Sequence, residues 1–316
     1  MLMSQRTAVV EMRKPPALKP GDTVAVVAVS AAIEPAALER GIEALHTLGY
    51  QTRVSAHVTD REGIFAGGDQ VRAREFTNCY KDPEVKAVFA ARGGYGCGRL
   101  LPMIDFAAIA RTPKIFLGFS DATFLLNALI NHADCVSFHG PMVAMDFAKG
   151  LSQRSLEHLA ALLSGSVTGF ELPARDVIRP GLAEGPLIGG CLSVITAMLG
   201  TPWQPVFDGR ILFLEDTGEK AYRIDRMLVQ MRQAGVLGRV AGIVFGALRP
   251  VDESERERGL IRRFVEEQTA GLECPVLFGV EAGHGTENLT LPLGARVRLD
   301  SHRAALVCTE LPVSPS

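Results

Sequence analysis

The stretch TVAVVAVSAAIEPAALERGIEALHTL, residues 23–48, decides the fold class of this 316-residue chain. Its first seven residues are an unbroken run of β-branched residues and alanine, which is typical of a buried strand. From Pro35 onward, Leu38, Ile42 and Leu45 recur at helical spacing, so a helix is predicted after the strand. A continuous apolar strand followed by an amphipathic helix is the repeating unit of a parallel sheet.

The same alternation returns in the first half of the chain. Val85–Ala91 precedes a glycine-rich loop, and Lys114–Leu117 precedes a helical stretch at 122–131. We therefore predict an α/β, Rossmann-like domain over residues 1–163, with a parallel sheet covered on both faces. Function in such sheets gathers at the carboxyl ends of the strands, so the loops 30–31, 92–98 and 118–121 are expected along one rim.

The second half of the chain is more mixed. Residues 164–186 are rich in serine, glycine, proline and charge without a clear period, and we predict a linker there. Strand and helix patterns then alternate between 187 and 270, and short strands follow up to residue 307. A C-terminal mixed, β-rich α/β domain is therefore expected over residues 187–316.

Composition excludes several classes of protein. Hydrophobic residues at 47% and charged residues at 22% are globular proportions. The 33 basic and 35 acidic residues are spread without blocks, so neither nucleic acid nor a membrane surface is an expected partner. No apolar run approaches the ~18 residues that a membrane span needs. Residues 1–11 lack the apolar core of a secretory signal, so a cytoplasmic location is expected.

The sequence offers no motif for a metal or a cofactor. The six cysteines include no C-x-x-C pair, and free thiols are expected. No H-E-x-x-H, no dinucleotide fingerprint and no phosphate-binding P-loop occur. We therefore expect an enzyme or binding protein for a small partner, without metal or cofactor.

Ser120 lies in the sequence GFSD, residues 118–121, between an apolar strand and a helix. A serine on such a tight turn has the placement of a hydrolase nucleophile, but the pattern G-x-S-x-G is incomplete because position 122 is Ala122. The alternative is that Ser120 is a plain helix cap and that Asp121 favours the helix dipole. This stretch alone leaves both open.

The glycine-rich loop RGGYGCG, residues 92–98, also follows a strand. It can present backbone N–H groups to an anion or a developing oxyanion. The alternative is a tight turn whose glycines supply positive φ angles.

A serine nucleophile needs a histidine base and a carboxylate that orients it. Among the seven histidines, His139 and His284 stand beside glycine after an apolar segment, and His284 has the better loop context between Gly283 and Gly285. The segment FLED, residues 213–216, ends a predicted strand with two carboxylates, and Glu215 is the candidate acid, although a charge at a helix start is the more common explanation for such a residue.

Long motifs across nearly the whole chain resemble the LD-carboxypeptidase family of serine peptidases, which also includes the microcin C self-immunity peptidases. The stretches that carry the resemblance are KPGDTVAVVAVS, ARGGYGCGRLL, FLGFSDAT, FHGPM, IGGCLSVITAMLGTPW, LFLEDTGEKAYRIDRMLVQMRQAG and GVEAGHGTENLTLPLGA. The resemblance implies a triad of Ser120, Glu215 and His284. It leaves His139 as a structural histidine.

The resemblance also implies the reaction and its setting. The family releases terminal D-Ala from murein tetrapeptide during cell-wall recycling, and a homodimer is expected. Backbone N–H groups of Gly94 and Asp121 would form the oxyanion hole. An arginine is the natural reader of the substrate carboxylate, with Arg92, Arg223 and Arg226 as candidates, each with a salt bridge as the alternative.

One position departs from the family pattern, and two other functions stay open. Cys191 stands where many members carry Asn, which puts a polar contact to substrate or between domains in doubt. A microcin-type immunity peptidase would use the same triad on a peptidyl-nucleotide, and an aromatic platform for the base would favour it. The only tryptophan is Trp203, in a motif that the carboxypeptidases share. A catalytically inactive module that binds cell-wall peptides is the other alternative.

Overall fold

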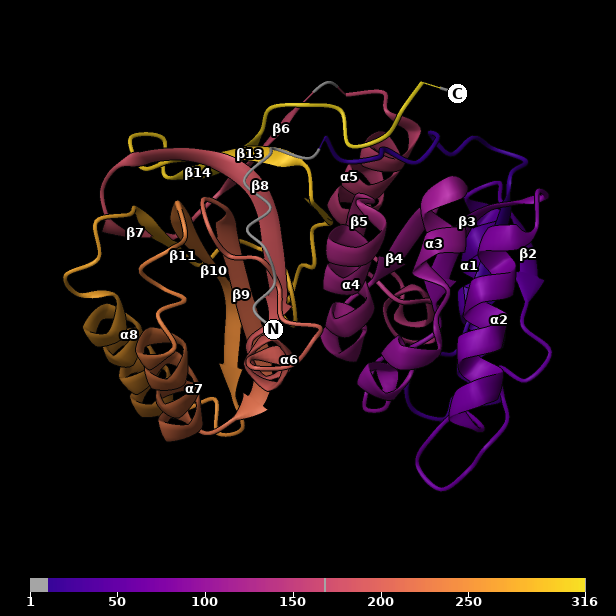
Figure 1. Ribbon diagram of the computed structural model, residues 1–316, viewed down its shortest axis with the longest axis horizontal. Coiled ribbons are helices and arrows are strands. Elements are labelled where there is room, and N and C mark those ends of the chain that lie inside the picture. The colour runs from indigo at the N-terminus through magenta and orange to yellow at the C-terminus, as the bar shows by residue number, and fades with distance from the viewer. Residues whose placement is uncertain (1–10, 168, 316) are drawn as a thin grey trace.

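The computed structural model describes residues 11–167 and 169–315. The expected cytoplasmic location rests mostly on residues 1–10, which lie outside the described residues. The described chain forms two halves, each built on one sheet (Figure 1). None of its helices is both long and apolar enough to cross a membrane.

The first half contains five parallel strands in the order β5-β4-β3-β1-β2. Alternate residues of the first strand face two different cores, because a strand buried on both faces points successive side chains in opposite directions. The predicted Rossmann-like arrangement is confirmed. Its elements are β1 (Thr23–Val27), α1 (Pro35–Thr47), β2 (Gln51–Val54), α2 (Asp69–Lys81), β3 (Val85–Ala90), α3 (Phe106–Arg111), β4 (Ile115–Gly118), α4 (Thr123–Ala133), β5 (Ser137–His139) and α5 (Gln153–Ser164).

The second half is a mixed eight-stranded sheet in the order β6-β14-β13-β8-β9-β10-β11-β7. Strands β8 to β11 are parallel, and the remaining strands pair antiparallel on either side. Its elements are β6 (Phe170–Pro173), β7 (Asp176–Arg179), β8 (Leu182–Cys191), α6 (Leu192–Met198), β9 (Ile211–Glu219), α7 (Ala221–Gln233), β10 (Gly242–Pro250), α8 (Glu255–Thr269), β11 (Val276–Phe278), β13 (Arg296–Asp300) and β14 (Ala305–Cys308).

Two features differ from the sequence expectation. The stretch 164–186, expected as a linker, contains β6, β7 and the start of β8, so it is part of the second sheet. The first sheet is not purely parallel, because β12 (Leu291–Leu293) comes from the second half and pairs antiparallel with β5.

The two halves share one interior. Helix α4 of the first half contacts α6 and β8 of the second, and it lies between the two sheets in Figure 1. One hydrophobic cluster contains residues of both halves, among them Leu125, Leu192 and Phe213. A site at this junction is therefore held from both sides.

Candidate active site

Ser120 lies on a strained turn at the carboxyl end of β4. A short 3₁₀ turn, Ser120–Ala122, joins this strand to α4, and Ser120 has a φ of 59°. A side chain with positive φ is uncommon outside asparagine, aspartate and histidine, and such strain gathers at functional sites. The predicted strand-to-helix turn is present, with the strained backbone that a nucleophile elbow requires.

The glycine loop lies directly against this turn. A Cβ added to Gly93 would be 2.9 Å from Ser120 Cβ, so only glycine allows this approach. Gly94 has a φ of 110°, so the loop is also the tight turn with positive φ that was the alternative prediction for its glycines. Among the hydrogen bonds of residues 11–167 and 169–315, none uses the N–H of Gly94 or Asp121. Both groups are free to donate to a ligand.

Asp121 has a structural role that the sequence did not indicate. Its Oδ2 accepts a hydrogen bond of 2.8 Å from the backbone N–H of Cys97, which ties the glycine loop to the serine turn. The buried Arg72 supports the same loop from below, because its guanidinium donates to the carbonyls of Val29 and Gly96. These contacts fix the relative positions of the two candidate oxyanion donors.

Glu215 and His284 form the polar centre of the site. Glu215 lies in the middle of β9 with no exposed surface. Its Oε2 accepts from the backbone N–H of His284 at 3.0 Å and lies 2.7 Å from Nδ1 of the same residue. Gly283 makes this approach possible, since a Cβ there would lie within 2.6 Å of three atoms of the Glu215 side chain. The carboxylate therefore favours the His284 tautomer with the proton on Nδ1, which leaves Nε2 able to accept a proton.

The charges of this pair follow from its surroundings. Burial alone would raise the pKa of Glu215, but contacts from His139 and His284 outweigh burial and lower the pKa to about 2. Burial alone would lower the pKa of His284, but Glu215, Asp216 and Asp146 together raise it above the ordinary value of 6.5. The carboxylate is thus ionised at neutral pH and strengthens the basicity of the imidazole.

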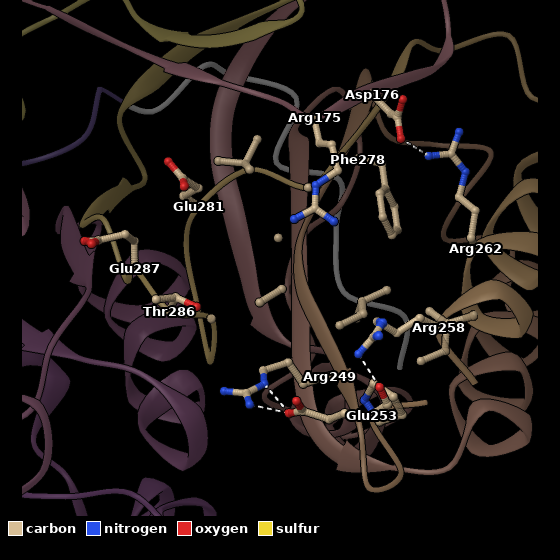
Figure 2. Close-up of a pocket in the computed structure, with 18 of the residues that line it drawn as sticks. Arg175, Asp176, Arg249, Glu253, Arg258, Arg262, Phe278, Glu281, Thr286 and Glu287 are labelled. Atoms are coloured by element: carbon tan, nitrogen blue, oxygen red, sulfur yellow. Dashed lines mark hydrogen bonds and ion pairs between the residues drawn. The ribbon is translucent and has the colours of Figure 1, made fainter. Parts of the chain in front are cut away.

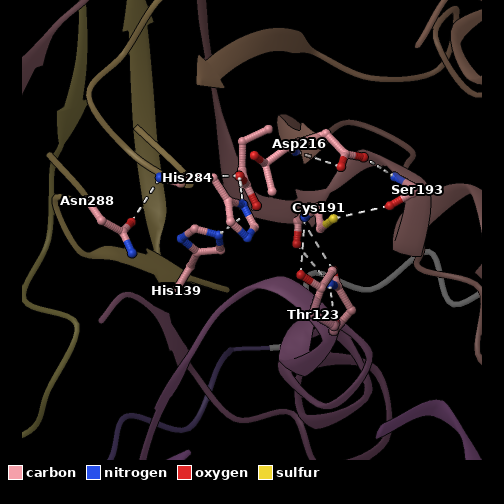
Figure 3. A network of polar contacts seen from close by, with 12 residues as sticks. Thr123, His139, Cys191, Ser193, Asp216, His284 and Asn288 are labelled. Carbon is pink, nitrogen blue, oxygen red and sulfur yellow. Dashed lines mark hydrogen bonds and ion pairs between the residues drawn. The ribbon is translucent and has the colours of Figure 1, made fainter. Parts of the chain in front are cut away.

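His139 is a second histidine at this carboxylate (Figure 3). Its side chain is fully buried, and its Nε2 lies 3.6 Å from Oε1 of Glu215. The sequence analysis predicted a structural role for His139 and assigned the base to His284. The register explains its position, because β5 pairs with β4 so that His139 is opposite Gly118, two residues before Ser120.

Phe119 connects the serine turn to the histidine. Its ring centroid lies 4.6 Å from that of His284. The described residues show no hydrogen bond between the hydroxyl of Ser120 and the ring of His284. A catalytic serine and its base need not be hydrogen-bonded before substrate binds. The structure thus brings Ser120, Glu215 and His284 to one junction from three separate elements.

A hollow of about 310 Å³ opens beside His284. Phe119 and His284 line it together with two cations, Lys149 and Arg249. Arg249 donates to the backbone carbonyl of His284 at 3.2 Å. Lys149 follows the π-helix Val143–Phe147 and makes no hydrogen bond or ion pair within the described part of the chain. Neither cation was indicated by the sequence.

A larger hollow of about 590 Å³ adjoins the first along Arg249 and the loop 285–287 (Figure 2). Its walls come from β10, β11 and α8. Arg262 there pairs with Asp176 at 2.6 Å, and Arg249 pairs with Glu253. Arg175 also lines this hollow, beside Gly279.

The three arginines predicted to read a carboxylate do not line the hollow beside His284. Arg92 lies at the start of the glycine loop and donates to the carbonyl of Ala32 at 3.0 Å. Arg223 pairs with Glu219 at 3.4 Å, and Arg226 lies over the ring of Tyr222.

Cys191, the departure from the family pattern, is buried at the end of β8 opposite Glu215. Its backbone N–H donates to Thr123 Oγ1 of the first half at 3.1 Å, and its Sγ lies 3.3 Å from the hydroxyl of Ser193. The contact between the halves is therefore made by the backbone at this position. All six cysteines are unpaired, as expected.

The described residues contain no cluster of histidine, cysteine or acidic side chains able to hold a metal ion.

Known families match both halves of the chain. The LD-carboxypeptidase N-terminal domain matches residues 24–140, and the LD-carboxypeptidase C-terminal domain matches residues 184–299. The chain belongs to the LD-carboxypeptidase family.

Individual relatives of this family agree over nearly the full length. The chain is 36% identical to a probable murein peptide carboxypeptidase of Bacillus subtilis, over 91% of this chain and 92% of the relative. It is 34% identical to the murein tetrapeptide carboxypeptidase of Pseudomonas aeruginosa, over 89% and 94% of the two chains. The structure of a muramoyltetrapeptide carboxypeptidase from Oxalobacter formigenes superposes with a TM-score of 0.83 at 34% identity, covering 93% and 100%. The microcin C7 self-immunity protein of Escherichia coli is 28% identical over 92% and 94%.

Proposed function

We propose that this member of the LD-carboxypeptidase family is a serine carboxypeptidase that releases the terminal D-Ala from murein tetrapeptide in cell-wall recycling. The observation that carries the proposal is the buried Glu215–His284 pair beside the strained turn of Ser120. The murein peptide carboxypeptidases that resemble the chain support the choice of substrate.

The residues divide the chemistry as in other serine hydrolases. His284 removes the proton from Ser120, whose oxygen attacks the carbonyl before D-Ala and forms the tetrahedral intermediate. The backbone N–H groups of Gly94 and Asp121 stabilise the oxyanion. His284 then gives its proton to the leaving amine, and water attacks the acyl-serine to release the shortened peptide. Glu215 orients the imidazole and stabilises its charged form.

The position of His284 indicates where the leaving D-Ala binds. Because His284 Nε2 protonates the amine of D-Ala, the α-carboxylate of that residue, two bonds away, must lie close to this ring. The hollow beside His284 contains Lys149 and Arg249 as its cations. We propose that Lys149 reads this carboxylate and that Arg249 holds the histidine loop. Arg92, Arg223 and Arg226 stay candidates for other carboxylates of the peptide.

The proposed reader has a direct test. Wild-type enzyme should strongly prefer a tetrapeptide with a free terminal carboxylate over the same peptide with a terminal amide. Lys149→Met should raise KM for the free acid and remove most of this preference, because the cation supplies it. Lys81 is the last residue of α2 and pairs with Asp105 at 3.7 Å, so it offers a matched surface control. Unchanged preference in the Lys149 variant would assign the carboxylate to another residue.

The activity itself is tested with L-Ala-γ-D-Glu-diaminopimelate-D-Ala and mass spectrometry. The expected product has lost one alanine and nothing else. Cleavage at another bond, or binding without turnover, would contradict the proposal, and binding alone would favour the inactive peptide-binding module.

A microcin-type immunity peptidase is the second candidate, since the self-immunity protein is also a relative. That function needs an aromatic platform for a nucleotide base. Trp203 packs instead against Phe106 and His132, with ring centroids 5.7 Å and 4.8 Å away, and it lines neither hollow at the site. Comparing kcat/KM for the tetrapeptide and for a peptidyl-nucleotide amide separates the two functions.

Location and assembly complete the proposal. The family resemblance supports a cytoplasmic homodimer. Cell fractionation and analytical ultracentrifugation test these two points.

A further inference from the structure

We infer that His139 is a positioning residue that holds the second oxygen of Glu215 from the nucleophile's half of the molecule. This inference rests on the proposed function, in which Glu215 orients His284. It assigns a part in the reaction to a histidine that the sequence treated as structural.

The two oxygens of the Glu215 carboxylate differ in their hydrogen-bond partners. Oε2 of Glu215 receives two contacts from His284, through its backbone N–H and its Nδ1. Oε1 is buried and has no hydrogen bond in the described residues, and the same is true of both ring nitrogens of His139. A buried carboxylate oxygen without a partner costs on the order of 1–3 kcal/mol or more. His139 Nε2, 3.6 Å away, is placed to satisfy it.

The side chain and the backbone of His139 are both held in place by their neighbours. The edges of two aromatic rings confine its imidazole, with centroids 5.7 Å away at Phe119 and 5.1 Å away at Phe213. The backbone is held between two strands, because β4 pairs with His139 through Gly118 and β12 pairs through Leu291. The ring therefore has little freedom to turn from the carboxylate.

The contact between His139 and Glu215 connects the two sheets. His139 and the serine turn are fixed to each other through β4 and β5, whereas Glu215 lies on β9 of the other sheet. His139 thus holds Glu215 in a fixed position relative to the half that carries Ser120. A shift of about 1 Å at such a site is enough to lower the rate of an enzyme strongly.

The distance of 3.6 Å is slightly longer than a hydrogen bond. Shortening it by a few tenths of an ångström gives an N–H···O hydrogen bond. With Nε2–H as donor, His139 then shares the negative charge of Glu215 with His284.

The consequence is a defined electrostatic effect on the base. Removing the donor leaves more of the carboxylate charge to His284, so the pKa of His284 should rise. The other charged groups near His284 are Asp216 on β9, Asp146 on the π-helix and the cations Lys149 and Arg249 of the adjoining hollow, and none of them is altered by the change. A histidine that only fills space would not shift this titration.

The test uses three substitutions in the full-length protein. His139→Phe keeps a ring but has no N–H to donate. His139→Asn keeps an amide on a side chain that is too short to reach Glu215. His139→Gln keeps an amide N–H near the position of Nε2. His158→Gln is the control, because His158 is a partly buried histidine away from Glu215 whose Nε2 lies 2.8 Å from the carbonyl oxygen of Thr290.

Two readouts are measured for each folded variant. NMR titration of the His284 ring reports the Glu215–His284 pair without any need for turnover. The donor-free variants should raise its midpoint by roughly half to one pH unit. They should lower kcat by about 10–100-fold with little change in KM, by analogy with residues that orient metal ligands. His139→Gln should recover most of both effects, and His158→Gln should show neither.

The outcomes are distinct. A donor-free variant with a lower melting temperature but an unchanged His284 midpoint and kcat would overturn the positioning role. So would His139→Gln values as poor as those of His139→Phe. If wild-type protein releases no D-Ala, the proposed function fails by itself, while the NMR titration still decides whether His139 acts on the pair.

Discussion

Replacing Glu215 by glutamine keeps the shape of the side chain and removes its charge. The site lowers the pKa of this carboxyl from 4.5 to about 2. It thus favours the ionised over the neutral form by about 3 kcal/mol. Only the part of this preference that increases when His284 is protonated lowers the barrier, so a loss on the order of 100-fold is the upper bound for the charge alone. The amide can also turn its NH₂ toward Nδ1 of His284 and select the wrong tautomer, so the total loss in kcat should approach ~10⁴.

The assay is the release of D-Ala from the tetrapeptide at saturating substrate. Asp216→Asn is the matched control, because Asp216 is the next residue on β9 and accepts from the backbone of Ser193 and Thr217 instead of touching His284. It should change kcat by less than about tenfold. A folded Glu215→Gln enzyme within tenfold of wild type would refute the role of Glu215 as the orienting acid.

Three further predictions concern the same site. Ser120→Ala and His284→Ala should each lose on the order of 10⁶ in kcat, and the double variant should be hardly worse, because triad members act as a unit; additive losses would argue against a triad. The acid limb of kcat/KM should have its midpoint above pH 6.5, because His284 must be neutral to act as base and its pKa is raised; Glu215→Gln should move that limb to lower pH. Tetrapeptide ending in D-Ala should be cleaved and its L-Ala diastereomer should not, because a fixed carboxylate reader turns the wrong stereocentre away from the serine; comparable kcat/KM for the two would exclude that geometry.

The buried strands of the first half could be predicted from the sequence because each is a continuous apolar run. Thr23–Val27, Val85–Ala90 and Ile115–Gly118 are buried on both faces, so nearly every residue reports the core. By contrast, β6 and β7 were missed within 164–186. They are the two edge strands of the second sheet and are only partly buried, so their polar residues hide the strand period.

The candidate site shows a similar division. Ser120 and the glycine loop could be found because local turn chemistry is written in adjacent residues. His284 and Glu215 needed the family resemblance, since their contact spans 69 positions. The contact of His139 with Glu215 depends on how two sheets pack, and no local pattern marks it. Lys149 was missed for the same reason, because the π-helix that precedes it brings it to the site only in the folded protein.

Ser120 is the proposed nucleophile, and trapping the acyl-enzyme is the direct test of this role. Enzyme quenched with acid during turnover of the tetrapeptide would be digested and examined by mass spectrometry. The fragment that contains Ser120 should carry an adduct with the mass of the tripeptide acyl group, and this adduct should be absent in Ser120→Ala. Release of D-Ala with no adduct on that fragment, or with the adduct on Cys191, would contradict it.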